Sequence, residues 1–465
     1  MPEFDVVVIG AGPAGENVAG RTAPAGLSTA IVEHQLIGGE CSYWGCIPSK
    51  TLIRPGDVIA AARRVPGAAE AVTGTIDVEA ALAQRDYMTS NWDDSGQVPW
   101  LDDNGIALFR GTARLTGPRS VAVTGADGEV TTLTARRAVV LATGTTAFLP
   151  PIPGLADVRA WTNREVTGMT SVPRRLVVLG GGAVGTEMAQ AVKRLGAEEV
   201  TVVEGADRLL AREEPFAGTE VGKAFTDEGI SVRTGTRVTA LERDGDGAVV
   251  ATLDDGGTVT ADEVLVAVGR RPATTDLGLE TVGLTPGRPV DVDERLVATG
   301  IEQGDDPWLY AVGDCNGVAL LTHMGKYQAR IAGDVIAGKK ITDRASRDVV
   351  PRVTFTDPQV CAVGLTEAQA RERGLPVRVV STPTGGVSGA YTSGNGIQGT
   401  CFLVVDTERE VIVGATFTGP ATAELLHSAT VAVIGRVPMS DLWHAVPSFP
   451  TVSEVWLRLL EAYGL

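Results

Sequence analysis

The sequence is poor in cysteine and in positive charge, and it has no long apolar run. Five cysteines among 465 residues are too few for the disulfide framework of a small secreted domain. The net charge of −17 argues against a surface for nucleic acid or for an anionic membrane. No apolar run reaches the roughly 18 residues of a transmembrane helix, and the first residues lack the basic segment of a signal peptide. We therefore expect a cytoplasmic protein without a nucleic-acid or membrane partner.

Two segments share one pattern of strand, glycine-rich turn, helix, second strand and acidic residue. The glycines permit a tight turn and a close approach of a pyrophosphate, the helix N-terminus supplies amide donors, and the acid can accept from a ribose hydroxyl. One such turn is weak evidence, because many are ordinary turns, but two complete units are strong evidence. We therefore predict two dinucleotide sites, which suit a flavin exchanging electrons with a nicotinamide. The residues are Gly10, Gly12, Gly15 and Glu33 in the first unit, and Gly180, Gly182, Gly185 and Glu204 in the second.

The order of the patterns predicts the fold. Strands that end at Gly144 and Gly269 are typical of the return from a nucleotide-binding domain, and a further strand ends at Asp314. The nucleotide patterns stop near residue 345. Beyond it, residues 366–373 indicate a helix opened by its threonine, and residues 400–405 and 411–418 indicate a hairpin. We predict an α/β fold with two Rossmann-like dinucleotide-binding domains and a C-terminal α+β domain. The predicted segments are 1–150 and 272–345 for the first dinucleotide domain, 151–271 for the second, and 346–465 for the C-terminal domain.

The run from Gly38 to Lys50 contains two cysteines, Cys41 and Cys46, shortly after the first unit. Two thiols at this spacing can close a small disulfide ring. Pro48 suits the first turn of a helix, whose positive end would stabilise the thiolate of Cys46. Two buried, unreactive thiols are the alternative. Because a nucleotide site precedes the run, we favour a redox-active pair.

The cysteine run is similar to one in a known family. The run Cys-x4-Cys-Ile-Pro-Ser-Lys, the strand from Tyr310 to Asp314 and the segment from Phe355 to Pro358 follow the order found in the pyridine nucleotide-disulfide oxidoreductases. This is the family of dihydrolipoamide dehydrogenase, glutathione reductase and mercuric reductase. The chain resembles it over nearly its whole length. The resemblance implies a homodimer in which the C-terminal interface domain completes the partner's active site.

The resemblance also implies roles for the cofactor-binding residues. The residues of the first turn would hold the ADP half of FAD, and Asp314 would bind its ribityl chain. The residues of the second turn would hold the nicotinamide dinucleotide. Glu204 can accept from the 2′-hydroxyl of NAD and would repel the 2′-phosphate of NADP, so we expect NAD(H) to be preferred over NADP(H). Arg208 and Arg212 follow closely, but we interpret them as solvated surface charges.

The same resemblance assigns the redox residues. Cys46 would face the flavin as a thiolate, and Cys41 would exchange with a substrate disulfide. Lys50 lies one helical turn after Cys46 and would pair with Glu187 beside the reactive edge of the flavin.

The C-terminal segment departs from the family pattern. The disulfide reductases have a histidine that manages the proton of the exchange thiol, followed five residues later by a glutamate. Here the glutamate is Glu454, but Phe449 stands at the histidine position and cannot accept a proton. His444 could substitute, although a lone histidine is more often structural. Mercuric reductases carry a cysteine pair near the C-terminus, and no cysteine follows Cys401 here, so we expect neither mercury reduction nor a bound metal.

We conclude from the sequence that the chain is an FAD-dependent NAD(P)H oxidoreductase. Electrons would pass from the nicotinamide through FAD and the Cys41–Cys46 disulfide to a small-molecule acceptor. That acceptor is a disulfide, or else a quinone or metal ion that needs no histidine-assisted thiol exchange. A dihydrolipoamide dehydrogenase is one alternative function. An FAD-binding redox sensor without enzymatic activity is another, which the complete nicotinamide turn argues against.

Overall fold

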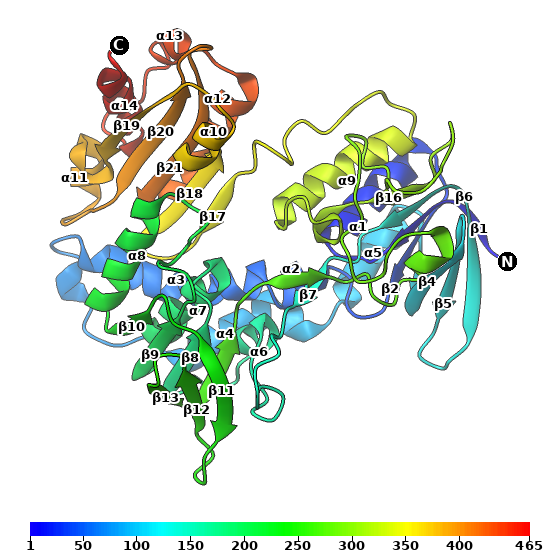
Figure 1. The fold of residues 1–465 in the computed structure, drawn as a ribbon, viewed down its shortest axis with the longest axis horizontal. Helices are drawn as coiled ribbons and strands as arrows, with labels where there is room; N and C mark the ends of the chain where they lie inside the picture. Colours follow the sequence, from blue (N-terminus) through cyan, green and yellow to red (C-terminus); the bar gives the residue numbers. More distant parts are fainter. The chain divides into compact units, whose positions relative to one another are not determined.

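The computed structural model describes residues 1–465, which form two compact units that we describe separately (Figure 1). The first unit comprises Met1–Pro48, Asp86–Ala147 and Arg270–Arg347, and the second comprises Ser49–Arg85, Phe148–Gly269 and Asp348–Leu465. The four-segment division made from the sequence stays a prediction. No helix combines the length and the apolar character that crossing a bilayer requires.

The first unit is built on a seven-stranded sheet in the order β3-β2-β1-β6-β5-β4, with β16 added beside β6. The strands β3, β2, β1, β6 and β16 run parallel, and their apolar residues form the buried core of the unit. Helices α1 and α9 pack against each other. The strands are β1 (Glu3–Ile9), β2 (Thr29–Glu33), β3 (Ile106–Arg110), β4 (Thr112–Gly117), β5 (Ser120–Thr124), β6 (Val130–Leu141) and β16 (Leu309–Ala311), with the separate antiparallel pair β7 (Thr145–Ala147) and β15 (Arg270–Pro272). The helices are α1 (Pro13–Thr22), α2 (Gly39–Tyr43), α5 (Val98–Asp103) and α9 (Thr322–Ile336).

The second unit contains a parallel sheet in the order β10-β9-β8-β14 and an antiparallel three-stranded sheet, β11-β12-β13. Its strands are β8 (Arg175–Leu179), β9 (Glu199–Val203), β10 (Ile230–Arg233), β11 (Val238–Arg243), β12 (Val249–Leu253), β13 (Thr258–Ala261) and β14 (Glu263–Val266). The helices of this part are α3 (Cys46–Arg63), α4 (Val78–Met88), α6 (Asn163–Thr167), α7 (Ala183–Arg194) and α8 (Pro215–Asp227). Helix α3 begins, and α4 ends, in segments assigned to the first unit.

The C-terminal part of the second unit is a five-stranded antiparallel sheet in the order β17-β18-β21-β20-β19, coloured yellow to orange in Figure 1. Its strands are β17 (Arg352–Thr354), β18 (Gln359–Gly364), β19 (Val377–Pro383), β20 (Thr400–Asp406) and β21 (Val411–Gly419). Its helices are α10 (Glu367–Glu372), α11 (Ser388–Ser393), α12 (Leu426–Gly435), α13 (Met439–Leu442) and α14 (Val455–Tyr463). The predicted hairpin is therefore confirmed as β20 and β21.

The helix predicted at Thr366 is also confirmed. Thr366 is the N-cap of α10, and its hydroxyl accepts from the amide of Gln369 while the side chain of Gln369 accepts from the amide of Thr366. This reciprocal capping satisfies two amides that the helix cannot pair internally, and so it sets the start of the helix. The predicted fold class, with two dinucleotide-binding folds and an α+β domain after them, is that of the structure.

Candidate functional site

The first glycine turn connects β1 to α1. Gly10 has φ +102°, and a Cβ there would lie 2.5 Å from the carbonyl oxygen of Ala142. A Cβ on Gly15 would lie 1.8 Å from the carbonyl oxygen of Gly10. In contrast, a Cβ on Gly12 would meet only the Cα of Gly39, at 3.9 Å. The outer two glycines are therefore required by the backbone itself, whereas the middle one leaves open space at the helix N-terminus.

The second turn, from β8 to α7, repeats this stereochemistry. A Cβ on Gly180 would lie 2.5 Å from the oxygen of Ala267, and one on Gly185 would lie 1.9 Å from the oxygen of Gly180. A Cβ on Gly182 would meet nothing within 4 Å. Both helices thus begin at an uncrowded glycine, and the unpaired amides of the first helical turn are available to an anion. The residues present fit a pyrophosphate at each turn.

An acidic residue at the end of the second strand closes each turn in the same way. Glu33 accepts from the amides of Ala11 (2.8 Å) and Gln35 (2.7 Å). Glu204 accepts from the amides of Gly181 (2.6 Å) and Ala206 (2.7 Å). Burial opposes ionisation of Glu33, but hydrogen bonds from His34 and the two amides hold its pKa below the usual value. Each carboxylate is therefore fixed at the edge of its glycine turn, where a ribose would lie.

Asp314 follows β16 at the carboxyl end of the first sheet. Thr145 donates to its Oδ2 at 2.9 Å, and Arg270 donates to the Thr145 hydroxyl at 2.7 Å and to the Thr145 carbonyl at 2.8 Å. Burial raises the pKa of Asp314. Neither Thr145 nor Arg270 is predicted from the sequence as part of this site. The sequence does nevertheless contain a signal for Arg270, because this residue directly follows the predicted turn at Gly269.

The two predicted glycine turns at Gly144 and Gly269 lie in different units. Gly144 has φ +68°, and its carbonyl oxygen accepts a hydrogen bond from the amide of Ala273. Gly269 has φ +139°, and its carbonyl oxygen accepts from the amide of Phe148. Each is in the left-handed region that favours glycine.

The cysteines lie at the junction of two helices. Cys41 belongs to α2, and Cys46 is the first residue of α3. The two thiols lie beside each other, and the hydrogen bond between Cys41 and Cys46, together with burial, raises the pKa of Cys41. The hydroxyl of Thr322, at the start of α9, lies 3.4 Å from the sulfur of Cys46 and also bonds to Cys41, a contact that the sequence analysis did not foresee.

In the second unit, Lys50 of α3 lies against Glu187 of α7. The Nζ of Lys50 is 2.6 Å from Oε2 of Glu187, and Oε1 of Glu187 accepts from the amide of Phe355 at 2.9 Å. The ammonium also lies 4.9 Å from the centre of the Phe355 ring. Glu187 is buried, and each of its two carboxylate oxygens accepts a hydrogen bond within this cluster.

Phe449 is 75% exposed, and its neighbours do not form a proton relay. Glu454 accepts from Arg458 at 3.0 Å and from the amide of Ser388 at 3.3 Å. His444 is exposed, and no hydrogen bond joins it to Glu454. The carboxylate that would orient a catalytic histidine is thus held by an arginine and a backbone amide.

A sequence model described as pyridine nucleotide-disulphide oxidoreductase matches residues 4–331, and that of the dimerisation domain of the same family matches residues 350–459. The chain belongs to this family. It is 34% identical to a dihydrolipoyl dehydrogenase of Thermus scotoductus, covering 99% of this chain and 98% of that one. It is 29% identical to a mercuric reductase of Bacillus cereus, covering 97% and 70%.

Two solved structures are similar over almost the whole chain. The HOCl-induced flavoprotein disulfide reductase RclA of Escherichia coli, solved as a Cu(II) complex, has a TM-score of 0.86 at 25% identity, with 99% of each chain covered. LpdA of Mycobacterium tuberculosis has a TM-score of 0.87 at 25% identity, with 100% of each covered. Family membership confirms the predicted class of flavin-dependent pyridine nucleotide-disulfide oxidoreductase and supports FAD as cofactor. The dimerisation domain supports a homodimer.

Proposed function

We propose that this chain is an NADH-dependent flavoprotein reductase whose terminal acceptor is a quinone or a metal ion. The first glycine turn, Glu33 and Asp314 would hold FAD, and the second turn with Glu204 would hold NADH. When bound, FAD supplies the chemistry that converts hydride from the nicotinamide into electrons for the Cys41–Cys46 disulfide. The chain's own part is to hold Cys41 beside Cys46, with the hydroxyl of Thr322 against both sulfurs.

The preference for NADH follows from the fixed position of Glu204. Hydrogen bonds from two backbone amides orient its carboxylate, which can accept from a 2′-hydroxyl and would repel a 2′-phosphate. Arg208 lies nearby but donates to the carbonyl of Ala211 at 2.9 Å and pairs with Asp207 at 3.3 Å, so it is engaged within its own loop. Comparing kcat/KM for NADH and NADPH tests this preference. A higher value for NADPH would overturn it.

The observation that carries the acceptor class is Phe449. A phenyl ring cannot take up the proton of an exchanging thiol, and Glu454 is engaged by Arg458 rather than by a histidine. General acid–base help is typically worth about 10²–10⁴-fold, so dithiol–disulfide exchange should be slow by this route. One-electron or two-electron reduction of a quinone or a metal ion needs no such relay. The Cu(II) bound to RclA supports a metal ion as one form of acceptor.

Steady-state assays with lipoamide, glutathione disulfide, menadione and Cu(II) separate these acceptors. We expect turnover with menadione or Cu(II) to exceed that with either disulfide. The variant Phe449→His should raise turnover with lipoamide by about tenfold or more, whereas Phe449→Ala, which only removes the ring, should not. Fast turnover of lipoamide by the unaltered enzyme would overturn the proposal.

Dihydrolipoyl dehydrogenase activity is a second candidate, favoured by the 34% identity to the Thermus scotoductus enzyme. Fast lipoamide turnover that falls in the variant Cys41→Ser would establish it in place of the first proposal. An FAD-binding sensor remains the alternative from another class. Anaerobic addition of NADH decides this point, because a sensor without a working nicotinamide site would leave the flavin absorbance unchanged.

A further inference from the structure

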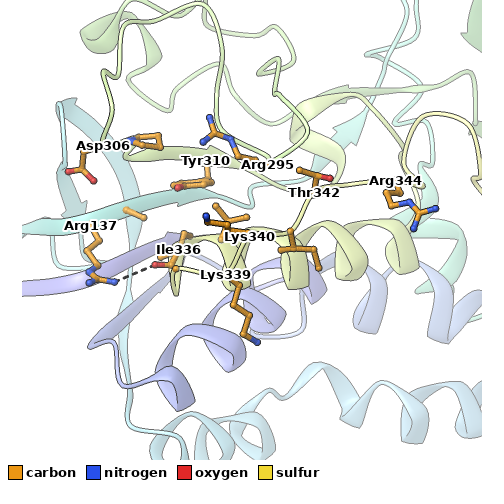
Figure 2. A pocket seen from close by; sticks show the side chains of 14 residues that line it. Arg137, Arg295, Asp306, Tyr310, Ile336, Lys339, Lys340, Thr342 and Arg344 are labelled. Atoms are coloured by element: carbon orange, nitrogen blue, oxygen red, sulfur yellow. Dashed lines mark hydrogen bonds between the residues drawn. The ribbon is translucent and has the colours of Figure 1, made fainter.

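A cavity of about 860 Å³ lies in the first unit, at the amino end of β16 and beside the β6 residues that precede its pairing with β16 (Figure 2). The residues proposed to hold FAD follow the carboxyl ends of the strands of the same sheet, because Gly10 follows β1 and Asp314 follows β16. The cavity is therefore at the other end of the sheet from the dinucleotide site. Its size is within the range of small-molecule sites in proteins.

The charge of this cavity is opposite to that of the whole chain. Five of its lining residues are lysine or arginine and one is acidic, whereas the chain has 40 basic and 57 acidic residues. In Figure 2, Arg295, Tyr310 and Lys340 lie together at the middle of the cavity. Arg137 and Asp306 lie at one end, and Arg344 lies at the other.

Two of the five cations already have carboxylate partners. Arg295 pairs with Asp293 at 3.1 Å, and Lys339 pairs with Asp334 at 3.0 Å. The acidic lining residue, Asp306, pairs with Arg119 outside the cavity.

The other three cations, Arg137, Lys340 and Arg344, pair with no carboxylate. Arg137 donates only to the carbonyl of Ile336, at 3.4 Å. Lysine and arginine at a helix C-terminus often serve only to complement the helix dipole. Lys339 and Lys340 lie just after the end of α9, and Arg137 of β6 donates to the carbonyl of its last residue, so all three can complement the dipole, whereas Arg344 lies well beyond the helix. The cavity nevertheless presents three positive charges that no carboxylate pairs with.

A buried tyrosine provides a second observation. Tyr310 of β16 is only 4% exposed, and its hydroxyl makes no hydrogen bond with the protein. Burial raises the pKa of this phenol, so the group is a neutral hydroxyl. The residue is buried but its oxygen is not, so this hydroxyl faces the cavity and is free to donate to a ligand. Ile336 and Ile341 line the cavity beside it and add an apolar wall.

We propose that this cavity binds a small phosphorylated organic anion of nucleotide size, at a site separate from both dinucleotide turns. Phosphate groups match the unpaired guanidinium and ammonium groups, since arginine presents parallel donors to phosphate oxygens. The Tyr310 hydroxyl supplies one further donor, and the apolar wall accommodates the organic part. An inorganic anion would use the cations but not the wall.

Titration calorimetry of the FAD-loaded protein tests this proposal, with saturating NAD⁺ present so that the nicotinamide turn is occupied. ATP and inorganic tripolyphosphate are the probes. We expect both to bind, ATP the more tightly, and we expect added salt to weaken both. The variant Lys340→Glu should bind about tenfold more weakly, because it replaces an attractive contact by a repulsive one. The matched control Lys223→Glu changes the net charge equally at an exposed position of α8 and should bind like the unaltered protein.

Each other result counts against a defined part of the proposal. Absence of binding by the unaltered protein, or equal weakening by Lys340→Glu and Lys223→Glu, would overturn the site. Equal affinity for ATP and tripolyphosphate would overturn the assignment to an organic anion. Tyr310→Phe removes only the hydroxyl and should weaken binding with the thermal unfolding temperature unchanged. Unchanged affinity in that variant would remove the hydroxyl from the site.

Discussion

Gly182 and Gly185 of the second turn allow a test that separates ligand binding from folding, because alanine at each position adds a single methyl group. Alanine at position 185 would place Cβ 1.9 Å from the carbonyl oxygen of Gly180, whereas carbon–oxygen contacts need about 3.3 Å. The backbone must therefore move by more than an ångström. Overpacking of this kind costs about 1–3 kcal/mol, and the contact here is with rigid backbone, so we expect a loss near the upper value. Alanine at position 182 meets nothing within 4 Å and has φ −77°, which any residue adopts.

Gly182→Ala should therefore leave stability within about 1 kcal/mol of the unaltered protein, because loss of an N-cap glycine and reduced entropy of the unfolded chain nearly offset. Its methyl group would occupy the space at the N-terminus of α7 where a pyrophosphate fits, and we expect the Kd for NADH to rise about tenfold or more. Gly185→Ala should lower the thermal unfolding temperature by about 5 °C. Gly222→Ala, within α8 and also without a contact within 4 Å, is the matched control. It should leave the Kd for NADH unchanged and should not lower the thermal unfolding temperature.

Thermal unfolding followed by circular dichroism and NADH binding followed by calorimetry provide the two measurements on each variant. We expect opposite outcomes: the substitution at position 182 should alter NADH binding alone, and the substitution at position 185 should first alter stability. A Gly182→Ala protein that binds NADH normally would show that the pyrophosphate does not lie at this turn. A Gly185→Ala protein of unchanged stability would show that the close backbone approach is not needed.

Three further substitutions test single contacts. Glu204→Ser removes the fixed carboxylate, and we expect weaker NADH binding and a kcat/KM ratio of NADPH to NADH at least about tenfold higher, measured by steady-state kinetics. Glu187→Ala leaves the ammonium of Lys50 and a buried amide without their acceptor, and chemical unfolding should show a loss of about 2–4 kcal/mol. Glu187→Gln should restore only part of it, because glutamine has one acceptor oxygen for the two donors. Burial raises the pKa of Asp57 to about 6 despite an ion pair with Arg194, so its contribution to stability is complete below about pH 4 and is lost as the pH rises through 6. Asp57→Asn should remove that decline. At pH 7 its free energy of unfolding, measured by chemical denaturation, should exceed that of the unaltered protein by about 1–2 kcal/mol, a value that allows for partial solvent screening. Unchanged stability between pH 4 and 7 in the unaltered protein would contradict this.

The sequence predicted those features that depend on contacts close along the chain. Both glycine turns follow from the local succession of strand, turn and helix, and α10 follows from the reciprocal capping of Thr366 and Gln369. Contacts between distant segments could not be predicted in this way. Thr322 lies 276 residues from Cys46, and Arg270 lies 125 residues from Thr145, so neither contact leaves a periodic pattern in the sequence. The cavity around Tyr310 is likewise assembled from four separate segments, which no local pattern connects.

The same distinction explains why the acceptor is harder to assign than the donor. The dinucleotide turns depend on backbone geometry that requires glycine, so their function can be predicted from the sequence of any chain that keeps those glycines. Phe449 has no such role in folding, because its ring is 75% exposed and contributes little to the core. Trp443 and Val446, 40% and 85% exposed, are close to it in sequence. Three exposed apolar residues within seven positions are not explained by the packing of this chain, but they suit a surface that a partner subunit or an acceptor covers. We therefore expect Phe449 to act through a group outside its own subunit, and the Phe449→His and Phe449→Ala pair tests this expectation.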